Sequence, residues 1–474
     1  MIQAPVLQGS GKGGNKTPKE APDSLFSNNI ARILDLLSEG EIEGIVGDTE
    51  EERLQNTFYN EVPIRSPDGV LNYSGVAIQA NWGTPDQTAL PGFDNVRTSV
   101  AVGQELPAGV NKTISFPNAG DVTAVAVTIS AQQFFKVEDD GDTVGTSVSF
   151  VIEVSENGGT FKTAYNGTIR GKQKNEYTAD YRVPIGDPNG NTAIRVRRTT
   201  PDSATLKVND TISFKTYTKI VEHKFSYPNM AVVGHTLDAK QFGNQLPNRQ
   251  YRVRGIKCRV PHNYDPVTRA YTGPFNGSLT TGKLYTNNPA WIFYELVTNK
   301  RYGLGKFVDP SVIDITSLYQ TGVWCDGMVP DGMGGTEPRW TCNTVITTRG
   351  EAFNLLRELV SCFRGTLFWM EAKLWALGDQ PRVPTKLVTN GNVIGGRFVY
   401  SGDSNRQRYS VINVSYNDPD LFFRRGIESV EDPDLVREIG YKPTDFGAFA
   451  CTSRGQARRV GRSILFSQEF ESEL

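Results

Sequence analysis

Short runs of alternating apolar and polar residues fill much of the chain and predict a protein built mainly from β-strands. Between residues 101 and 204, the segments VTAVAVTISA, TSVSFVIEVS, TFKTAYNGTI, YTADYRV and TAIRVRRT alternate or stay apolar over strand lengths. SENGG at 155–159 predicts a hairpin turn between two of these strands. Because regularly spaced short strands are typical of a β-sandwich, we expect 101–204 to form an inserted domain that folds alone.

Helical periodicity is confined to a few stretches. LFSNNIARILDLLSEG (25–40) predicts a helix, because its apolar residues recur at helical spacing, with Ser27 as the cap and Gly40 beyond the last turn. Another helix is predicted after Asn288 and Pro289, which suit the cap and the first helical position. Further strands are expected within 205–260 and 396–430, so the predicted fold class is mainly β with a few helices (α+β) and several domains.

Two more helices begin with a capping box. Thr348 and Glu351 occupy its two positions in TRGEAFNLLRELVSCFRG, and Ser453 and Gln456 occupy them in CTSRGQARRVGRSILFSQEF. Between these helices, TLFWMEAKLWAL predicts a hairpin that turns near Glu371-Ala372. Since Gly or Asn would be expected in such a turn, the sequence leaves its geometry open.

Composition narrows the function classes. The 474 residues carry a formal net charge of −2, so no global field favours nucleic acid or acidic lipid. No apolar run is long enough to predict a membrane span, and the first residues do not read as a signal peptide. The five cysteines are widely spaced and form no C-x-x-C pair, which favours reduced, packed thiols in a protein made in a cytoplasm.

The residues offer little chemistry. GSGKGGNKTPKEA (9–21) resembles a phosphate-binding loop, but Asn15 stands where lysine is needed and no strand precedes it, so residues 1–24 are expected to form a mobile arm. The three histidines lack metal-site spacing. The loop at 325–340 spaces Asp326, Asp331 and Glu337 like a calcium loop, but its other positions do not fit. We therefore expect no catalytic residue, no metal and no cofactor.

Basic residues open the last predicted helix, and glutamates close it, which opposes the helix dipole at a cost of about 0.3–1 kcal/mol per exposed terminal charge. A solvated face explains the run simply. The alternative is that the arginines have acidic partners elsewhere in this chain or in a neighbouring subunit. The candidates for contacts between subunits are Arg454, Arg458, Arg459 and Arg462.

Seven stretches stand out in order along the chain: GKGGNKTPKEA, LDLLSEGEIEG (34–44), YPNMAVVGHTLDAKQFG (227–243), VPHNYDPVTRAYTG (260–273), NNPAWIFYELVTNKRYGLGK (287–306), VPDGMGGTEPRWTCN (329–343) and FGAFACTSRGQARR (446–459). Together they resemble the tail-tip attachment protein J family of lambda-like long-tailed bacteriophages.

The resemblance implies the baseplate-hub fold, in which each chain supplies two related ring domains and a homotrimer forms a ring that adapts a six-fold tail tube to a three-fold tip. On this basis we expect a flexible arm at 1–24, a first ring domain at 25–100 with 205–260, the inserted sandwich at 101–204, a loop and helix insertion at 261–345, a second ring domain at 346–430 and a C-terminal hub segment at 431–474.

The resemblance also implies partners and a place in the virion. These partners are the distal tail protein, other tail-tip proteins including an iron–sulfur L-type protein, and the tape measure protein. Phage DNA would pass through the lumen without sequence-specific binding, and a host receptor would be bound by a region downstream of this chain. The implied role is a non-enzymatic hub of the virion tail tip, assembled in the bacterial cytoplasm. The competing readings are an adhesin that acts directly through this segment, and an enzyme.

Overall fold

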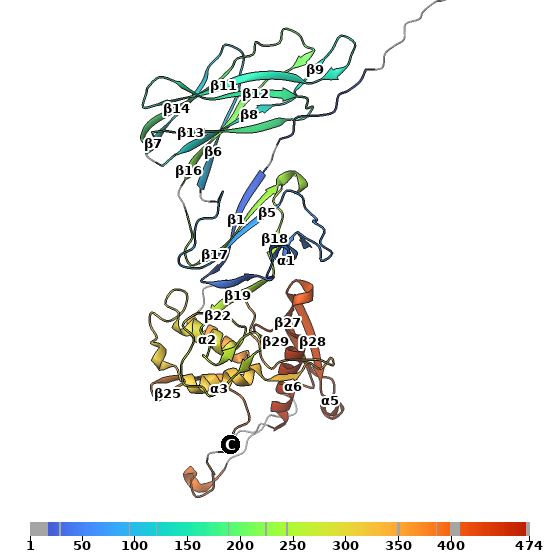
Figure 1. Cartoon of the computed structure of the whole chain (residues 1–474). Coiled ribbons are helices and arrows are strands. Elements are labelled where there is room, and N and C mark those ends of the chain that lie inside the picture. The colour runs from blue at the N-terminus through green and yellow to red at the C-terminus, as the bar shows by residue number, and fades with distance from the viewer. Residues whose placement is uncertain are drawn as a thin grey trace, which may run out of the picture. The chain divides into compact units, whose positions relative to one another are not determined.

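The computed structural model confirms a mainly β chain with a few helices (Figure 1). It describes residues 18–470, except 28–29, 94, 120, 188, 223–224, 243–244, 348–350, 385 and 399–407. The chain divides into two compact units. The first unit comprises residues up to 37 together with 49–251, and the second comprises 38–48 together with 252–474.

The first unit contains a β-sandwich of two four-stranded sheets. One sheet has the order β12-β11-β14-β7, and the other has the order β13-β8-β16-β6. Alternate side chains of both sheets fill the core, where Phe134, Phe150 and Phe214 are almost fully buried. The strands are β6 (Asn95–Glu105), β7 (Lys112–Ala119), β8 (Ala124–Ala131), β11 (Thr146–Glu156), β12 (Lys162–Gly171), β13 (Tyr177–Pro184), β14 (Asn189–Arg198) and β16 (Ser213–Glu222).

The sandwich extends beyond the boundaries 101–204 expected from the sequence. Strand β16 begins at Ser213 and lies between β8 and β6, and β6 begins at Asn95. Phe214 and Tyr217 of β16 belong to the core. The predicted boundaries therefore omit a central strand, because a β-strand that closes a sheet need not be adjacent in sequence to its neighbours. The predicted hairpin is confirmed, since β11 pairs with β12 across Asn157 and Gly158, both with positive φ.

The segment 18–27 packs against this sandwich, so the described part of the arm expected at 1–24 is held by contacts with the sandwich. Residues 1–17 of that arm lie outside the described residues. The side chain of Leu25 enters the sandwich core. The Lys172 ammonium, only 2% exposed, donates to Glu20 Oε1 at 2.7 Å and Asp23 Oδ1 at 2.8 Å. Hydrogen bonds from Lys172 and from Lys174, whose Nζ donates to Glu20 Oε2 at 2.7 Å, lower the pKa of Glu20 to about 2.

The first prediction concerns the independence of the sandwich. A fragment of residues 95–222 is expected to melt cooperatively, whereas a fragment of residues 101–204 is expected to show no cooperative transition, because it lacks β16 and the core residues that this strand contributes. Calorimetry of the two fragments under identical conditions tests this. Equal cooperative melting of both fragments would show that β16 is dispensable.

The helix predicted at 25–40 is wrong. Residues Ile30–Glu39 form strand β1, which pairs with β17 (Met230–Asp238), and β17 pairs with β5 (Ala77–Trp82). Ala31 and Ile33 pack into one hydrophobic cluster and Leu34 into another, so both faces of the strand find apolar neighbours. Tertiary contacts thus override the helical spacing. Ser27 does not cap a helix, and its Oγ accepts a hydrogen bond from Thr178 N at 2.8 Å instead.

Shorter elements complete the first unit. One small sheet has the order β18-β3-β4, and its strand β3 follows helix α1 in sequence. A second small sheet has the order β10-β9-β15. These elements are α1 (Glu50–Gln55), β3 (Thr57–Tyr59), β4 (Val62–Pro63), β9 (Phe135–Val137), β10 (Thr143–Val144), β15 (Val208–Asn209), η1 (Ala239–Phe242) and β18 (Arg249–Tyr251).

Three helices form the centre of the second unit. The predicted helix after Asn288 is confirmed as α2 (Pro289–Thr298), capped by the Asn288 side chain. It packs on α3 (Ile315–Asp326), where a Cβ on Gly322 would lie 2.7 Å from the Trp291 ring, so only glycine permits this approach. Helix α4 (Ala352–Ser361) adds Leu356, Leu359 and Val360 to the same core. Thr348 of the predicted capping box lies outside the described residues, and Glu351 is the N-cap without a side-chain capping bond.

Several strands surround these helices in the second unit. Strand β19 pairs with β2 and β22, and β20 pairs with β21, and β23 pairs with β24. The elements are β2 (Ile42–Ile45), β19 (Val253–Cys258), β20 (Tyr264–Asp265), β21 (Ala270–Tyr271), β22 (Leu284–Tyr285), η2 (Pro310–Val312), β23 (Met328–Pro330), β24 (Thr336–Pro338) and η3 (Ile394–Gly396).

The hairpin predicted within 366–377 is confirmed as β25 (Gly365–Met370) and β26 (Lys373–Gly378). Its two turn residues, Glu371 and Ala372, have φ of 54° and 57°, so this turn adopts the left-handed geometry that glycine or asparagine usually supplies.

A second sheet of this unit packs against the last helix. Strand β27 (Val411–Asp418) pairs antiparallel with β28 (Arg424–Glu431) and parallel with β29 (Pro443–Gly447), and α6 (Arg454–Phe470) covers it. A short helix, α5 (Pro433–Ile439), connects β28 to β29. Because β29 joins the sheet of β27 and β28 and α6 packs on that sheet, the expected division between 346–430 and 431–474 falls within one packed substructure.

Candidate functional site

Two of the stretches that carry the family resemblance, 260–273 and 287–306, meet in the second unit at Asp326, the last residue of α3. Its side chain is 2% exposed. Asp326 Oδ1 accepts a hydrogen bond from Arg269 Nη1 at 2.5 Å, and Oδ2 accepts from Tyr271 at 2.8 Å and from Asn288 Nδ2 at 2.7 Å. Burial, with Asp326 nearby, raises the pKa of Tyr271. This buried carboxylate therefore joins three segments that are distant in sequence.

The local sequence explains how the partners of Asp326 are held. Asn288 is fixed as the N-cap of α2, because its Oδ1 accepts from Ala290 N while its Nδ2 donates to Asp326. Arg269 lies in the turn that joins the paired strands β20 and β21, where its φ is 57°. Arg269 also donates to Asn287.

The same polar network reaches the start of α6. Asn287 Nδ2 lies 3.5 Å from Asn343 Oδ1, and Asn343 Nδ2 donates to Thr452 Oγ1 at 2.8 Å. Asn343 N donates to Ala450 O at 2.9 Å. We call the connected residues Arg269, Asn287, Asn288, Asp326, Asn343 and Thr452 the polar interlock. It holds α2, α3 and the segment before α6 in one arrangement.

The structure places the four arginines of α6 individually. Arg454 Nε donates to Glu428 Oε2 at 2.6 Å, and Arg459 Nη1 donates to Glu337 Oε1 at 2.6 Å. Arg458 donates to Gly332 O at 3.3 Å, whereas Arg462 is exposed and makes no ion pair with any described residue. Acidic partners for two arginines thus lie in this chain. The expected contacts between subunits stay a prediction.

The predicted capping box of α6 is half formed. Gln456 N donates to Ser453 Oγ at 3.1 Å, as a cap requires. The Gln456 side chain instead turns to Thr341, accepting from its N at 3.0 Å and donating to its O at 3.1 Å. The helix start is therefore bound to the segment that follows β24.

The loop at 325–340 is held by contacts other than those of a calcium loop. Asp331 Oδ1 accepts from Met333 N at 2.7 Å and Gly335 N at 2.9 Å, bonds that lower the pKa of Asp331. Glu337 binds Arg459 and accepts a hydrogen bond from Ser453. Within the described ranges, no three His, Cys, Asp or Glu side chains are grouped as metal ligands would be.

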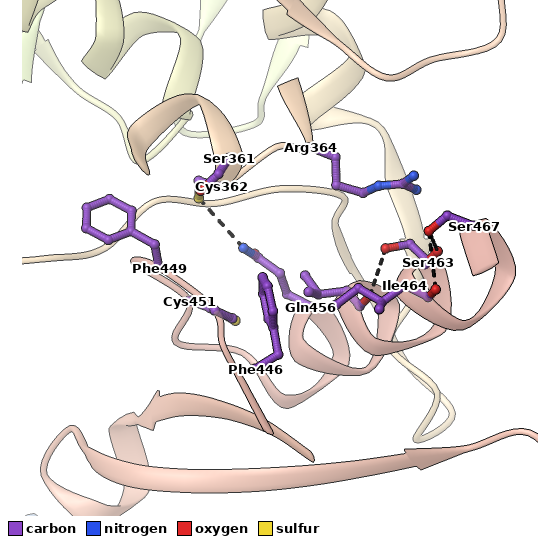
Figure 2. A pocket seen from close by; sticks show the side chains of 12 residues that line it. Ser361, Cys362, Arg364, Phe446, Phe449, Cys451, Gln456, Ser463, Ile464 and Ser467 are labelled. Atoms are coloured by element: carbon purple, nitrogen blue, oxygen red, sulfur yellow. Dashed lines mark hydrogen bonds between the residues drawn. The ribbon is translucent and has the colours of Figure 1, made fainter. Parts of the chain in front are cut away.

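A cleft of about 170 Å³ opens beside α6 (Figure 2). We call it the α6 cleft. Figure 2 shows the Gln456 side chain extending toward Cys362 on one wall. Its lining residues are Ser361, Cys362, Arg364, Phe446, Ala448, Phe449, Cys451, Gln456, Val460, Ser463, Ile464 and Ser467.

The thiols in this region are packed, as the sequence predicted. All five cysteines are free and buried. Burial raises the pKa of Cys258 and Cys325, which keeps these thiols protonated and poor nucleophiles. The arrangement stabilises a core rather than presenting a reactive sulfur.

A second buried network, in the first unit, centres on His235 of β17. The His235 side chain is fully buried, and its Nδ1 lies 2.8 Å from the Tyr59 hydroxyl and its Nε2 2.6 Å from the Tyr251 hydroxyl. Tyr251 donates to Asp35, which also binds Arg249 through two hydrogen bonds of 2.6 and 2.9 Å. Tyr251 therefore accepts from Nε2–H, and Nδ1 accepts from Tyr59, so the imidazole is neutral.

The electrostatics of this network follow from burial. Burial lowers the pKa of His235 to about 4, against a smaller opposing influence of Asp35. Burial acts to raise the pKa of Asp35, but hydrogen bonds from Arg249 and Tyr251 outweigh it and lower that pKa. The network joins β1, β3, β17 and β18 by hydrogen bonds, and its one cation and one anion are paired.

Gly40 lies in LDLLSEGEIEG (34–44), another of the stretches that carry the family resemblance, and it allows a close contact with Tyr302. Its φ is 90°, and a Cβ there would lie 2.3 Å from Tyr302 Cε1, so a side chain is excluded. Tyr302 donates to Glu295 Oε1 at 2.6 Å, and Glu295 also binds Lys283 at 2.6 Å. The neighbouring residues Glu39 and Arg301 form an ion pair. LDLLSEGEIEG thus contacts NNPAWIFYELVTNKRYGLGK through the bare backbone of Gly40 and through the Glu39–Arg301 ion pair.

Sequence reasoning did not single out the partners of Asp326 or the network of His235. The signal available was weak, because both networks draw single residues from segments separated by many positions. Both networks join strands and helices through hydrogen bonds and ion pairs. In the described part of the chain, no helix is long and apolar enough to cross a membrane.

Two family models match parts of the chain. Residues 96–223 match the FNIII-A domain of tip attachment protein J, and this range coincides with the sandwich from β6 to β16. Residues 351–473, which include α4 and α6, match a putative phage tail protein. The chain is therefore a protein of phage tails.

Two relatives that are similar over almost the whole of this chain identify the family. The chain is 37% identical over 463 residues to tip attachment protein J of Escherichia phage SECphi27, covering 97% of this chain and 38% of the relative. It is 32% identical to tip attachment protein J of Escherichia phage SECphi4, covering 98% of this chain and 40% of the relative. The chain belongs to the tip attachment protein J family and spans about two fifths of the length of these relatives.

Solved structures add nothing to this assignment. A structure of infectious bursal disease virus, Gx strain, covers 49% of this chain and 65% of its own at 10% identity and a TM-score of 0.19. A crystal structure of GEBA250068378 from Sulfurospirillum deleyianum covers 27% of this chain and 99% of its own at 13% identity and a TM-score of 0.17. Scores this low carry no argument.

Proposed function

We propose that this chain is the structural, non-enzymatic hub of a phage tail tip. Three copies would form a ring that closes the tail tube, adapts its six-fold symmetry to a three-fold tip and opens for genome ejection. The observation that carries this proposal is the similarity to tip attachment proteins J over 97% of the chain. The buried polar networks of both units support it, because they fix strands and helices in place as a rigid ring component requires.

The proposed partners follow from this place in the tail. They are two further copies of the chain, the distal tail protein, an iron–sulfur L-type tip protein and the tape measure protein. DNA would pass through the lumen without sequence-specific contacts, which favours an inner wall that is not strongly basic. Receptor binding would belong to a region downstream of this segment. The location would be the tail tip of the virion.

The second prediction is the trimer. Native mass spectrometry of the purified tail-tip component, together with imaging of assembled tips, is expected to give three copies that each bury well over about 2,000 Å². A closed ring needs two different patches per subunit, so each interface is heterologous. A monomer, a hexamer or an inner wall dominated by Lys and Arg would contradict the proposal.

Two arginine variants sharpen this test. Arg462 is exposed and without an ion pair among described residues, so Arg462→Glu is expected to leave the melting temperature of the chain unchanged and to weaken the trimer. Arg459→Ala is the matched control, because Arg459 binds Glu337 inside the chain and its loss is expected to lower the melting temperature instead. An Arg462 variant that assembles like the wild type would remove this residue from the interface.

The adhesin alternative makes a different prediction. If this segment acted directly on the host, the purified chain would bind host cells and compete with phage adsorption. We expect neither, because more than half of the length of these relatives lies outside the part that this chain matches.

A further inference from the structure

The N-terminal strap, which we define as residues 18–27, lies on the sandwich as an extended peptide lies on a binding protein. Near its start, Ala21 N donates to Thr143 O at 2.9 Å. Further along, Ser24 N donates to Lys172 O at 2.9 Å, and Lys172 N donates back to Ser24 Oγ at 2.9 Å. Main-chain hydrogen bonds of this kind are a common means by which β-proteins hold extended peptides.

Lys172 is a buried cation whose carboxylate partners come from the strap. Its side chain is 2% exposed, and its Nζ donates to Glu20 Oε1 at 2.7 Å and to Asp23 Oδ1 at 2.8 Å. These partners lie 152 and 149 positions away in the sequence. Among the described residues, no carboxylate of the sandwich itself forms an ion pair with Lys172. Because a buried ammonium needs a paired charge, the sandwich carries a cation that a bound acidic segment must neutralise.

The surface of the sandwich also leaves room for the strap. Gly171 has φ of 148°, and a Cβ there would lie 2.7 Å from Leu25 Cγ and 2.8 Å from Ser24 Oγ. A Cβ on Gly141, where φ is 88°, would lie 3.0 Å from Pro18 Cγ. The Leu25 side chain, 8% exposed, packs into the core of the sandwich. Glycine at both close approaches, together with a place for one apolar side chain, indicates a surface shaped for this segment.

We propose that this surface of the sandwich is a binding site for an extended acidic peptide, and that its ligand is the chain's own strap, which stays bound without a covalent link. The features recognised are the carboxylates of Glu20 and Asp23 and, two residues further on, the apolar side chain of Leu25. The sandwich thereby anchors the N-terminal segment of the chain. This function goes beyond the proposed hub and holds whether or not three copies form a ring.

A peptide accounts for these contacts better than a free phosphate or other small anion does. An anion could pair with the Lys172 ammonium, but it would leave the carbonyl oxygens of Thr143 and Lys172 without the donors that the strap supplies. It would also leave the space that Leu25 fills in the core.

Cutting the chain beside the strap tests the inference directly. A protease recognition sequence is inserted between Asn28 and Asn29 of the complete chain, and the folded protein is cleaved there. The piece that contains the strap is expected to co-elute with the remainder of the chain in size-exclusion chromatography at micromolar concentration. A piece that separates from the wild-type remainder would overturn the proposal.

Two lysines beside Glu20 give a matched pair of variants. Lys172→Met removes the buried charge and keeps most of the side-chain length, so the affinity of the remainder for the cleaved piece is expected to fall at least about tenfold. Lys174 also donates to Glu20, at 2.7 Å, but it is 47% exposed, so Lys174→Met is expected to lower the affinity by about fivefold at most. Equal affinities of the two variants would contradict the role given to Lys172.

A synthetic peptide keeps the test independent of how the lysine variants fold. A fluorescent peptide of residues 18–27 is expected to exchange with the cleaved piece and bind the wild-type remainder. The same peptide carrying Glu20→Gln and Asp23→Asn is expected to bind at least about tenfold more weakly, because it cannot neutralise Lys172. If both peptides bind equally, or if neither binds, the sandwich is not a site for an acidic peptide.

Discussion

Replacing Asp326 with alanine is expected to lower the free energy of unfolding of the second unit by about 3–5 kcal/mol. The carboxylate is 2% exposed and accepts three hydrogen bonds, so its loss leaves the Arg269 guanidinium, itself only 18% exposed, as an uncompensated charge. Tyr271 and Asn288 lose an acceptor as well. Removing one partner of a buried ion pair costs more than the pair contributes, because the remaining group keeps its desolvation penalty.

The measurement is urea denaturation followed by tryptophan fluorescence, which reports on this unit because Trp291 and Trp340 lie in its core. Asp379→Ala is the control. It removes an ion pair of similar geometry, with Arg364, but Asp379 is 62% exposed, so a cost below about 1 kcal/mol is expected. If both variants lose the same small amount of stability, the polar interlock does not hold the unit together.

Lowering the pH from about 6.5 to 4 is expected to destabilise the first unit through His235. The pKa of His235 is near 4 in the folded chain and near 6.5 when unfolded. Between these values the unfolded chain binds a proton that the folded chain does not, so stability falls as the pH falls. The loss approaches about 3 kcal/mol at pH 4. The lowered pKa of Asp35 adds a further loss only below the ordinary range of an aspartate.

Chemical denaturation of the first unit at a series of pH values measures this slope. His235→Gln keeps a polar group at the position but cannot titrate, so its stability should vary less between pH 6.5 and 4 than that of the wild type, although it is lower at neutral pH. His262→Gln is the control, because His262 is exposed and lies in the second unit, so its replacement should leave the curve of the first unit unchanged. Wild-type stability that is flat over this interval would show that His235 is already protonated or solvated in the folded chain.

Local rules predicted part of this fold and none of the buried networks. The sandwich strands and helix α2 could be read from the sequence, because alternation and the Asn288-Pro289 cap act within a few residues. Strand β1 was missed for the opposite reason. Its residues carry helical spacing, yet Ala31 and Leu34 pack on opposite faces of a strand beside β17.

The sequence by itself determined the β-rich class, most sandwich strands, the helices after Asn288 and Ser453, and the family, because these depend on neighbouring residues or on the order of short motifs. The tertiary structure alone decided that β16 completes the sandwich, that residues 30–39 form a strand, and that Arg269 and Asn288 meet at Asp326. Those outcomes depend on the free energy of burying apolar and charged groups against distant segments, which no local pattern encodes. The need for glycine at position 40 likewise depends on a distant residue, because the Tyr302 ring leaves no room for a side chain there.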